Sequence, residues 1–184
     1  MKVAILVYDT CVQFEVIIAA YLCKYNGEVV TVGLEMKDYQ TMEGFIVRPH
    51  MLLEDLDPDS IDAFIVPGGY PESIMGNLIL GKKLRSVNER GKLIAAICGG
   101  PVHLGKAGIL NGKRFTTTVL DKYPEAFEGG TYVDEDVVED GNILTAWPNA
   151  YVDFAVKIGD RLNLFKDQAD REETVRIFKG FQRC

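Results

Sequence analysis

Strand-length apolar segments alternate with segments of helical length, and this order most constrains the fold. Residues 2–8 (KVAILVY) form a continuous apolar run, residues 12–23 follow at helical length, and residues 28–34 (EVVTVGL) form a second strand-like run. Runs of this kind are typical of parallel strands that helices cover on both faces. The same order returns over residues 62–69, 77–90 and 92–98. The sequence therefore predicts a doubly wound α/β fold, a mostly parallel sheet with helices on both faces.

The remaining segments fit the same architecture without a second domain. The pattern predicts a short helix over residues 99–110 and two amphipathic helices within residues 151–181. Short strands are expected at 45–49, 113–118, 131–134, 136–140 and 142–146. With 184 residues, 47% of them apolar, and no repeat or linker, the chain is expected to form one domain over residues 1–184.

Charge and the N-terminal segment exclude several classes of partner. The net charge is −7 and the isoelectric point is near 4.9, whereas nucleic acids and anionic membranes are bound by basic surfaces. The apolar run of residues 3–8 is too short for a signal-peptide core or a membrane span. We therefore expect a cytoplasmic protein whose partner is a small neutral or polar molecule.

The cysteines and histidines do not form a metal-binding pattern. Cys11, Cys23, Cys98 and Cys184 lie in apolar or terminal contexts and are expected to be free thiols. There is no C-x-x-C pair or H-E-x-x-H motif. The acidic residues 134–140 (DEDVVED) lack the glycine and the ligand spacing of a calcium loop, which favours a solvated turn. We expect neither a metal nor a cofactor.

Cys98 stands where a predicted strand ends and a helix begins, the edge of the sheet at which sites form in this architecture. Gly99 and Gly100 permit a sharp turn, and Pro101 suits the first turn of a helix. A helix N-terminus lowers the pKa of a nearby thiol, so Cys98 is expected to be a partly ionised nucleophile. The alternative is a buried small hydrophobic residue at a tight turn.

A second glycine turn ends the preceding predicted strand, at Pro67, Gly68 and Gly69. Neighbouring parallel strands would bring the Gly68 and Gly69 amides close to Cys98. Together with the Gly99 amide, they are candidates to hold an oxyanion. On its own, this turn is better explained as an ordinary connection between a strand and a loop, and the pairing with Cys98 favours the functional interpretation.

Glu15 is the only charged residue between positions 12 and 23, on an otherwise apolar segment. A buried carboxylate needs a partner, and a catalytic role is one explanation. The other is a first-turn acid stabilised by the helix dipole.

His103 follows Cys98 by five residues, a helical rotation that points it away from the thiol, so a structural or surface role is expected. His50 follows a proline in a predicted loop and has no evident partner.

Four segments in order, VPGG, AAICGGP, AGILNGKRFTT and GNILTAWPNAYVDFA, behind a glutamate after the first strand, resemble the ThiJ/PfpI superfamily. The resemblance spans nearly the whole chain. It implies a flavodoxin-like α/β sandwich related to class I glutamine amidotransferase domains, usually a homodimer. In that comparison Cys98 matches the reactive cysteine and Glu15 its acidic partner, and Gly68, Gly69 and Gly99 match positions whose amides line the pocket.

Two positions depart from the pattern of the superfamily. Members that resemble intracellular proteases carry histidine where this chain has Gly99, which weakens a protease interpretation. Deglycase-like, glyoxalase-like and isonitrile-hydratase-like members often carry histidine where this chain has Thr118. No histidine then remains at either position to act as a base.

Two hypotheses follow for function. The first is a cysteine-dependent enzyme acting on a small reactive carbonyl, of glyoxalase or deglycase type, with Cys98 as nucleophile and Glu15 as proton donor and acceptor. The second is a redox-responsive or chaperone-like protein in which Cys98 is oxidised to a sulfinate without turnover.

For assembly, apolar residues surround nearly the whole circumference of the 12–23 helix, so we expect a homodimer through its outer face.

Overall fold

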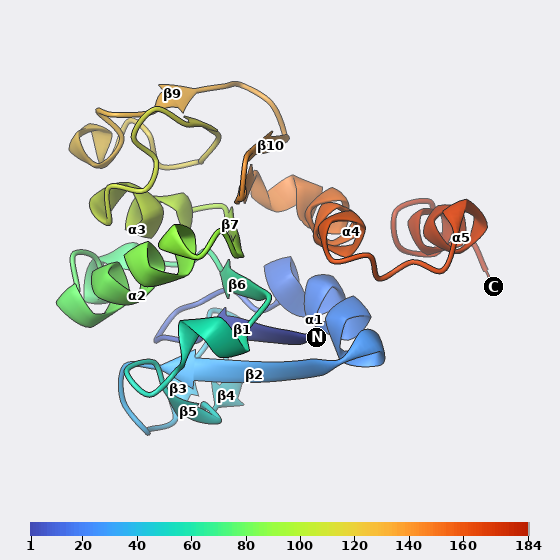
Figure 1. Cartoon of the computed structure of the whole chain (residues 1–184), viewed down its shortest axis with the longest axis horizontal. Coiled ribbons are helices and arrows are strands. Elements are labelled where there is room, and N and C mark those ends of the chain that lie inside the picture. The colour runs from blue at the N-terminus through green and yellow to red at the C-terminus, as the bar shows by residue number, and fades with distance from the viewer. Residues whose placement is uncertain (184) are drawn as a thin grey trace.

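The computed structural model describes residues 1–183 and is built on a seven-stranded sheet (Figure 1). The strand order is β10-β11-β7-β6-β1-β2-β5, with every neighbouring pair parallel except β10 and β11. The seven strands are β1 (Lys2–Leu6), β2 (Glu28–Gly33), β5 (Met51–Leu52), β6 (Ala63–Val66), β7 (Leu93–Ile97), β10 (Val137–Asp140) and β11 (Ile143–Ala146).

Two small sheets and nine helical segments complete the described chain. β3 (Tyr39–Gln40) pairs antiparallel with β4 (Ile46–Val47), and β8 (Arg114–Phe115) pairs parallel with β9 (Thr131–Tyr132). The α-helices are α1 (Phe14–Asn26), α2 (Leu78–Glu89), α3 (Pro101–Lys106), α4 (Tyr151–Arg161) and α5 (Gln168–Phe178). Four 3₁₀ turns each begin at a proline: Pro58–Ser60, Pro71–Ser73, Pro124–Ala126 and Pro148–Ala150.

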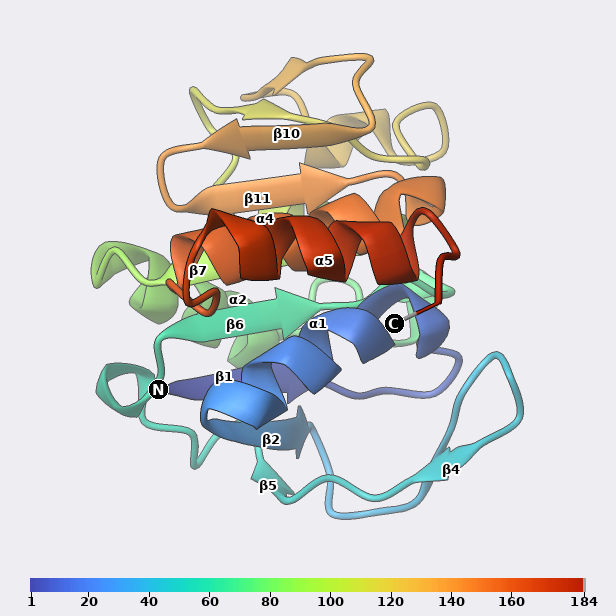
Figure 2. The same ribbon diagram turned by 90° about the vertical axis from the view of Figure 1, so that its right-hand side faces the viewer.

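Helices cover both faces of the sheet, which explains why its central strands are apolar throughout. α2 and α3 lie on one face and α1 and α4 on the other (Figures 1 and 2). Along β1, Ala4 and Leu6 pack toward the first face, and Val3 and Ile5 toward the second. Because successive side chains of a strand point to opposite faces, both sets are removed from water. The predicted α/β class, with a mostly parallel sheet between helices, is confirmed.

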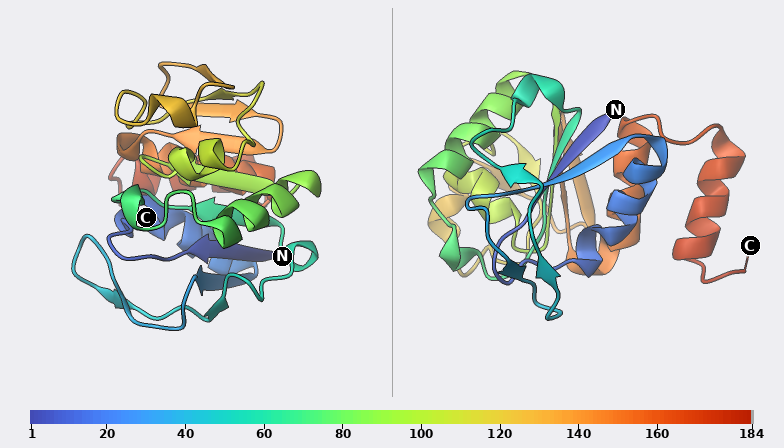
Figure 3. Two further views of the ribbon diagram at one scale, coloured as in Figure 1. Left: turned by 90° about the vertical axis from the view of Figure 1, so that its left-hand side faces the viewer. Right: turned by 90° about the horizontal axis from the view of Figure 1, so that it is seen from below.

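Helix α5 forms an additional layer outside α4 (Figure 3). None of its residues is fully buried. The Arg171 guanidinium holds it to α4 through two hydrogen bonds to the Asp160 carboxylate, of 2.7 and 2.9 Å. The Phe178 ring also meets the Tyr21 ring of α1 edge-on. Within residues 1–183, no helix is long and apolar enough to cross a bilayer.

The predicted strand over residues 113–118 is wrong in length, because only Arg114 and Phe115 pair with a neighbouring strand. The Thr116 amide donates instead to the Thr145 hydroxyl, at 2.9 Å. The Thr118 amide donates to the Cys98 carbonyl, at 3.2 Å. The threonine segment thus leaves the ladder of the small sheet and supports the loop that carries Cys98.

Candidate active site

Cys98 directly follows β7 and lies on a strained turn. Its φ angle is +62°, in the left-handed region that residues with a Cβ rarely adopt. Hydrogen bonds from both sides hold this conformation. The Cys98 amide donates to the Ala146 carbonyl at 2.8 Å, and the Cys98 carbonyl accepts from the Thr117 hydroxyl at 2.9 Å. The turn therefore presents the thiol, which is half-buried, at the carboxyl end of the sheet.

Gly100 lets the chain pass from this turn into α3. A Cβ at this position would lie 2.6 Å from the Val66 carbonyl oxygen and 2.9 Å from the carbonyl oxygens of Ile97 and Pro67. These three atoms belong to backbone and cannot move aside. The glycine in the CGGP segment is thus a requirement of close packing between neighbouring strand ends.

Glu15 lies in the first turn of α1 and is only 2% exposed. Its Oε2 accepts a hydrogen bond of 2.8 Å from the Gly68 amide. A Cβ on Gly68 would lie 2.5 Å from Glu15 Oε2 and 2.9 Å from Cys98 Sγ. The absence of a side chain on Gly68 therefore allows the carboxylate and the thiol to approach each other.

Burial raises the pKa of both members of this pair. Burial, followed by the negative charge of Glu15, raises the pKa of Cys98 to about 11, although the Thr118 hydroxyl and the Gly99 amide act in the opposite direction. Burial also raises the pKa of Glu15, whereas the hydrogen bonds from Cys98 and Gly68 lower it. At neutral pH the thiol form of Cys98 is therefore favoured. The expected lowering of the Cys98 pKa is therefore wrong, because burial beside an anion outweighs the turn into α3.

The three pocket glycines have different roles in the structure. The Gly68 amide is occupied by Glu15, so in this state it is not a free oxyanion donor. The Gly69 and Gly99 amides donate to no other group among the residues that the structure describes. Gly69 has φ of +130°, and a Cβ there would collide with the Thr10 carbonyl. The Gly99 amide faces the Cys98 sulfur. In the described chain, two of the three predicted amides are thus without a partner, and the Gly99 amide lies beside the thiol.

Thr118 occupies the position at which related sequences often have histidine. Its hydroxyl lies 3.7 Å from Cys98 Sγ and donates to it. A hydroxyl is not a base at neutral pH. Glu15 is therefore the ionisable group that the structure places against the thiol.

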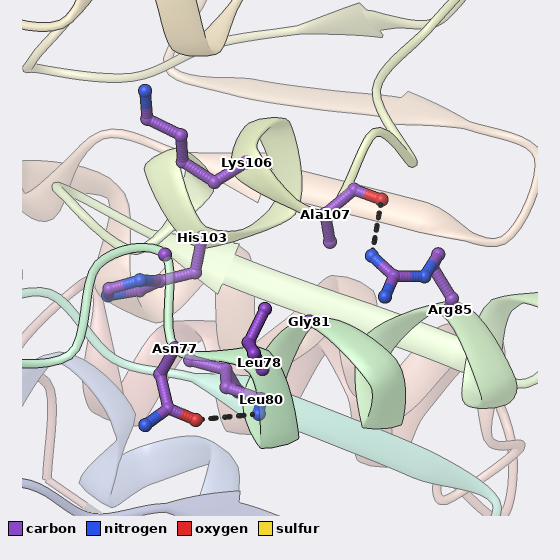
Figure 4. Close-up of a pocket in the computed structure, with 9 residues that line it drawn as sticks. Asn77, Leu78, Leu80, Gly81, Arg85, His103, Lys106 and Ala107 are labelled. Carbon is purple, nitrogen blue, oxygen red and sulfur yellow. Dashed lines mark hydrogen bonds between the residues drawn. The ribbon is translucent and has the colours of Figure 1, made fainter.

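Neither histidine takes part in the pair. His50 Nδ1 lies 2.7 Å from the Thr31 hydroxyl at the outer part of the sheet. His103 is 2% exposed, and neither of its ring nitrogens has a hydrogen-bond partner in the described chain. It lines a cavity of about 60 Å³ between α2 and α3, together with Asn77 and Arg85 (Figure 4). Burial lowers the pKa of His103 to about 4, so its ring is neutral.

Sequence reasoning missed the residues that support the site from behind. Thr117 holds the Cys98 carbonyl, and Tyr8 donates to the Gly68 carbonyl at 2.8 Å. Tyr8 ends the apolar run of residues 2–8, and in such a run an aromatic residue predicts only core packing. The signal available was its position, because a polar atom at the carboxyl end of a parallel strand lies close to the site.

The other cysteines and the acidic residues do not add to the site. Cys11 and Cys23 are buried free thiols, and burial raises the pKa of Cys23 to about 12. Cys184 lies outside the described residues. Within residues 1–183, no group of three or more histidine, cysteine or acidic side chains is arranged to hold a metal ion.

Comparison with known proteins agrees with this architecture. The model of the DJ-1/PfpI family matches residues 1–161. A deglycase of Thermococcus kodakarensis is 33% identical over 148 residues, which cover 79% of this chain and 89% of that protein. Protein DJ-1beta of Drosophila melanogaster is 34% identical over 177 residues, or 91% of this chain and 89% of the relative. Among solved structures, a DJ-1 superfamily protein from Agrobacterium tumefaciens superposes with a TM-score of 0.85 at 28% identity, over 100% of both chains. The resemblance to the ThiJ/PfpI superfamily is confirmed, and the chain belongs to the DJ-1/PfpI family.

Proposed function

We propose that this protein is a cysteine-dependent enzyme that converts a small 2-oxoaldehyde into a 2-hydroxy acid. The observation that carries the proposal is that Cys98 Sγ and Glu15 Oε2 lie together at Gly68, where each group shifts the pKa of the other. This contact provides a nucleophile and a base in one place, so the reaction does not depend on the histidines found in related sequences. A relative named as a deglycase supports the same class of chemistry.

The first step forms a covalent hemithioacetal. Cys98 Sγ attacks the aldehyde carbon, and the thiol proton passes to the Glu15 carboxylate. The carbonyl electron pair moves onto oxygen, where the Gly69 and Gly99 amides stabilise the alkoxide. Glu15 then returns the proton to that oxygen, which completes the adduct without a net change of charge.

The second step moves a hydrogen within the adduct. The Glu15 carboxylate removes the proton from the former aldehyde carbon, which gives an enediolate, and then returns that proton to the neighbouring carbon. The hydroxyl proton of the adduct passes to the oxygen of that neighbouring carbon, which leaves the thioester of the 2-hydroxy acid. Water hydrolyses the thioester, releasing the 2-hydroxy acid and restoring the Cys98 thiol. The net reaction adds one water to the 2-oxoaldehyde, with no external oxidant or reductant.

The test is turnover of methylglyoxal to lactate by the wild type and by Cys98→Ser. We expect the variant to lose at least a hundredfold in kcat, since a hydroxyl is a far weaker nucleophile than a thiol. Cys23→Ala is the matched control, because Cys23 packs between α1 and the sheet away from Glu15. Equal rates for wild type and Cys98→Ser would contradict the proposal.

A second candidate function is sensing of oxidants through Cys98. It is favoured by the finding that no imidazole touches the thiol in the described chain, whereas a protonated Glu15 can donate to a sulfinate. Exposure to peroxide followed by mass spectrometry distinguishes the two. Addition of two oxygens to Cys98 at low peroxide, with no turnover of the aldehyde, would support the sensor.

We also propose a homodimer through the outer face of α1. Four large apolar side chains on this helix are exposed, by 49% to 82%, namely Phe14, Ile17, Tyr21 and Tyr25. An exposed apolar patch of this kind marks a site of association, and one helix face can meet its own copy across a twofold axis. Light scattering at micromolar concentration should give a dimer for wild type and a monomer for Ile17→Lys. A wild-type monomer would contradict the proposal.

A further inference from the structure

Tyr8 is a buried tyrosine that connects the core to the glycine turn of the site. It follows β1, is 1% exposed and packs between the sheet and the helices α2 and α3. Its ring meets the His103 ring edge-on, with 5.9 Å between centroids. Its hydroxyl points into the turn, where it donates to the Gly68 carbonyl at 2.8 Å and lies 3.3 Å from the Pro67 carbonyl.

These two carbonyls belong to the peptide groups that carry the Gly68 and Gly69 amides. The Gly68 carbonyl and the Gly69 amide belong to one planar peptide group, and the Pro67 carbonyl and the Gly68 amide belong to another. The Gly68 amide donates to Glu15, and the Gly69 amide has no partner among residues 1–183. The Tyr8 hydroxyl is therefore connected to the Gly68 and Gly69 amides through their peptide groups.

Gly68 and Gly69 need such a support because glycine has a wider choice of backbone angles than any other residue. Gly69 is held at φ of +130°. The Val12 amide also donates to the Gly68 carbonyl, at 3.0 Å, so the carbonyl accepts from two sides. A hydrogen bond at a carbonyl polarises its peptide group and strengthens the amide at the other end as a donor.

We propose that Tyr8 is a positioning residue of the Cys98–Glu15 site, whose hydroxyl orients and polarises the peptide groups of Gly68 and Gly69. This inference rests on the proposed function and deepens it. Burial raises the pKa of Tyr8 well above its ordinary value, with the nearby thiols and Glu15 acting in the same direction. The hydroxyl therefore remains a donor at neutral pH.

The experiment compares Tyr8→Phe with Tyr39→Phe. The first substitution removes one hydroxyl and keeps the ring that packs on His103. The second removes a hydroxyl that bonds only to the Glu35 backbone, on a tyrosine that is also buried. Two readouts are taken, the kcat and KM for methylglyoxal and the pH dependence of Cys98 alkylation by iodoacetamide.

Tyr8→Phe should lower kcat about tenfold with KM changed less than twofold, because the looser amide stabilises mainly the alkoxide. The low-pH midpoint of the alkylation profile (its acid limb) should move up by about half a pH unit. The reason is that the Glu15 carboxylate loses part of its hydrogen bond from the Gly68 amide. Tyr39→Phe should match wild type in both readouts. If Tyr8→Phe also matches wild type in the alkylation profile, the inference is overturned.

The alkylation readout needs no turnover, so it separates this inference from the proposed function. A shifted profile in a protein that does not convert methylglyoxal would support Tyr8 while contradicting the enzyme. If Tyr8→Phe fails to fold, 3-fluorotyrosine placed at position 8 keeps the ring and gives a stronger donor. The acid limb should then move to lower pH, and an unchanged limb would overturn the inference.

Discussion

Replacing Glu15 by glutamine should lower the pKa of the Cys98 thiol. In the structure Cys98 and Glu15 both lie against Gly68, and the negative charge of Glu15 raises the pKa of the thiol, since ionising Cys98 would place two anions near each other. Glutamine removes the negative charge and keeps a side-chain donor of nearly the same shape. The thiolate would then be formed beside a neutral amide that can donate to it.

The magnitude follows from the packing at Gly68. The carboxylate oxygen and the sulfur lie 2.5 and 2.9 Å from the position that a Gly68 Cβ would occupy. Two unit charges about 5 Å apart interact by about 3 kcal/mol at an effective dielectric constant of about 20, or about two pKa units. The thiol stays buried in the variant, and burial continues to raise its pKa. We therefore expect the thiol pKa to fall from about 11 in wild type by about one to two units in Glu15→Gln.

Glu15→Leu separates charge from hydrogen bonding. It removes the anion as glutamine does, but leaves the thiolate without the side-chain donor. A lost hydrogen bond to a charged group costs about 1.5 to 3 kcal/mol, so its thiol pKa should exceed that of Glu15→Gln by roughly one to two units.

The assay is titration of the ultraviolet absorbance of the thiolate. Each protein is measured as a difference against the same protein carrying Cys98→Ser, which subtracts the other cysteines. Glu139→Gln, which removes an exposed carboxylate on β10, is the control and should leave the pKa unchanged. If wild type and Glu15→Gln give the same thiol pKa, the carboxylate does not act on Cys98 and the reasoning is refuted.

Two further predictions concern packing and pH. Gly68→Ala should abolish aldehyde turnover, because its methyl group would lie 2.5 Å from Glu15 Oε2; Gly81→Ala in α2 meets no such atom and should retain wild-type turnover. His103 has a folded pKa of about 4 against an unfolded value of about 6.5, so the unfolded state binds the proton more tightly and stability falls as pH falls through this window. Urea unfolding between pH 7 and pH 4.5 should show wild type losing about 2 to 3 kcal/mol more than His103→Leu, and equal losses would contradict a buried neutral imidazole.

The sequence was sufficient for the fold wherever a segment was long and its apolar pattern continuous. The strand over residues 2–8, the helix after it and the strand at 92–98 were found because each buries both faces or one whole side. β5 was not predicted as a separate strand, since two residues, Met51 and Leu52, carry no periodicity. The 113–118 segment was predicted too long because its last threonines bond to the Cys98 turn rather than to a strand.

The sequence predicted which residues lie together but not their electrostatics. Cys98 and Glu15 were singled out by a strand end and by an isolated charge, and in the structure both lie against Gly68. The direction of the thiol pKa was missed, because burial depends on how α1 closes over the site, which no local pattern records. Tyr8 was missed for the same reason, because only the folded chain brings its hydroxyl to the Gly68 carbonyl.

In the proposed reaction, Cys98 forms a covalent bond with the substrate and Glu15 moves the protons of the later steps. Rapid-quench mass spectrometry with methylglyoxal tests it directly, by following the mass of the peptide that contains Cys98. We predict an adduct that forms and decays during turnover in wild type, accumulates in Glu15→Gln and is absent in Cys98→Ser. Lactate formation by wild type with no adduct on Cys98 at any time, or with equal turnover by Cys98→Ser, would contradict the account.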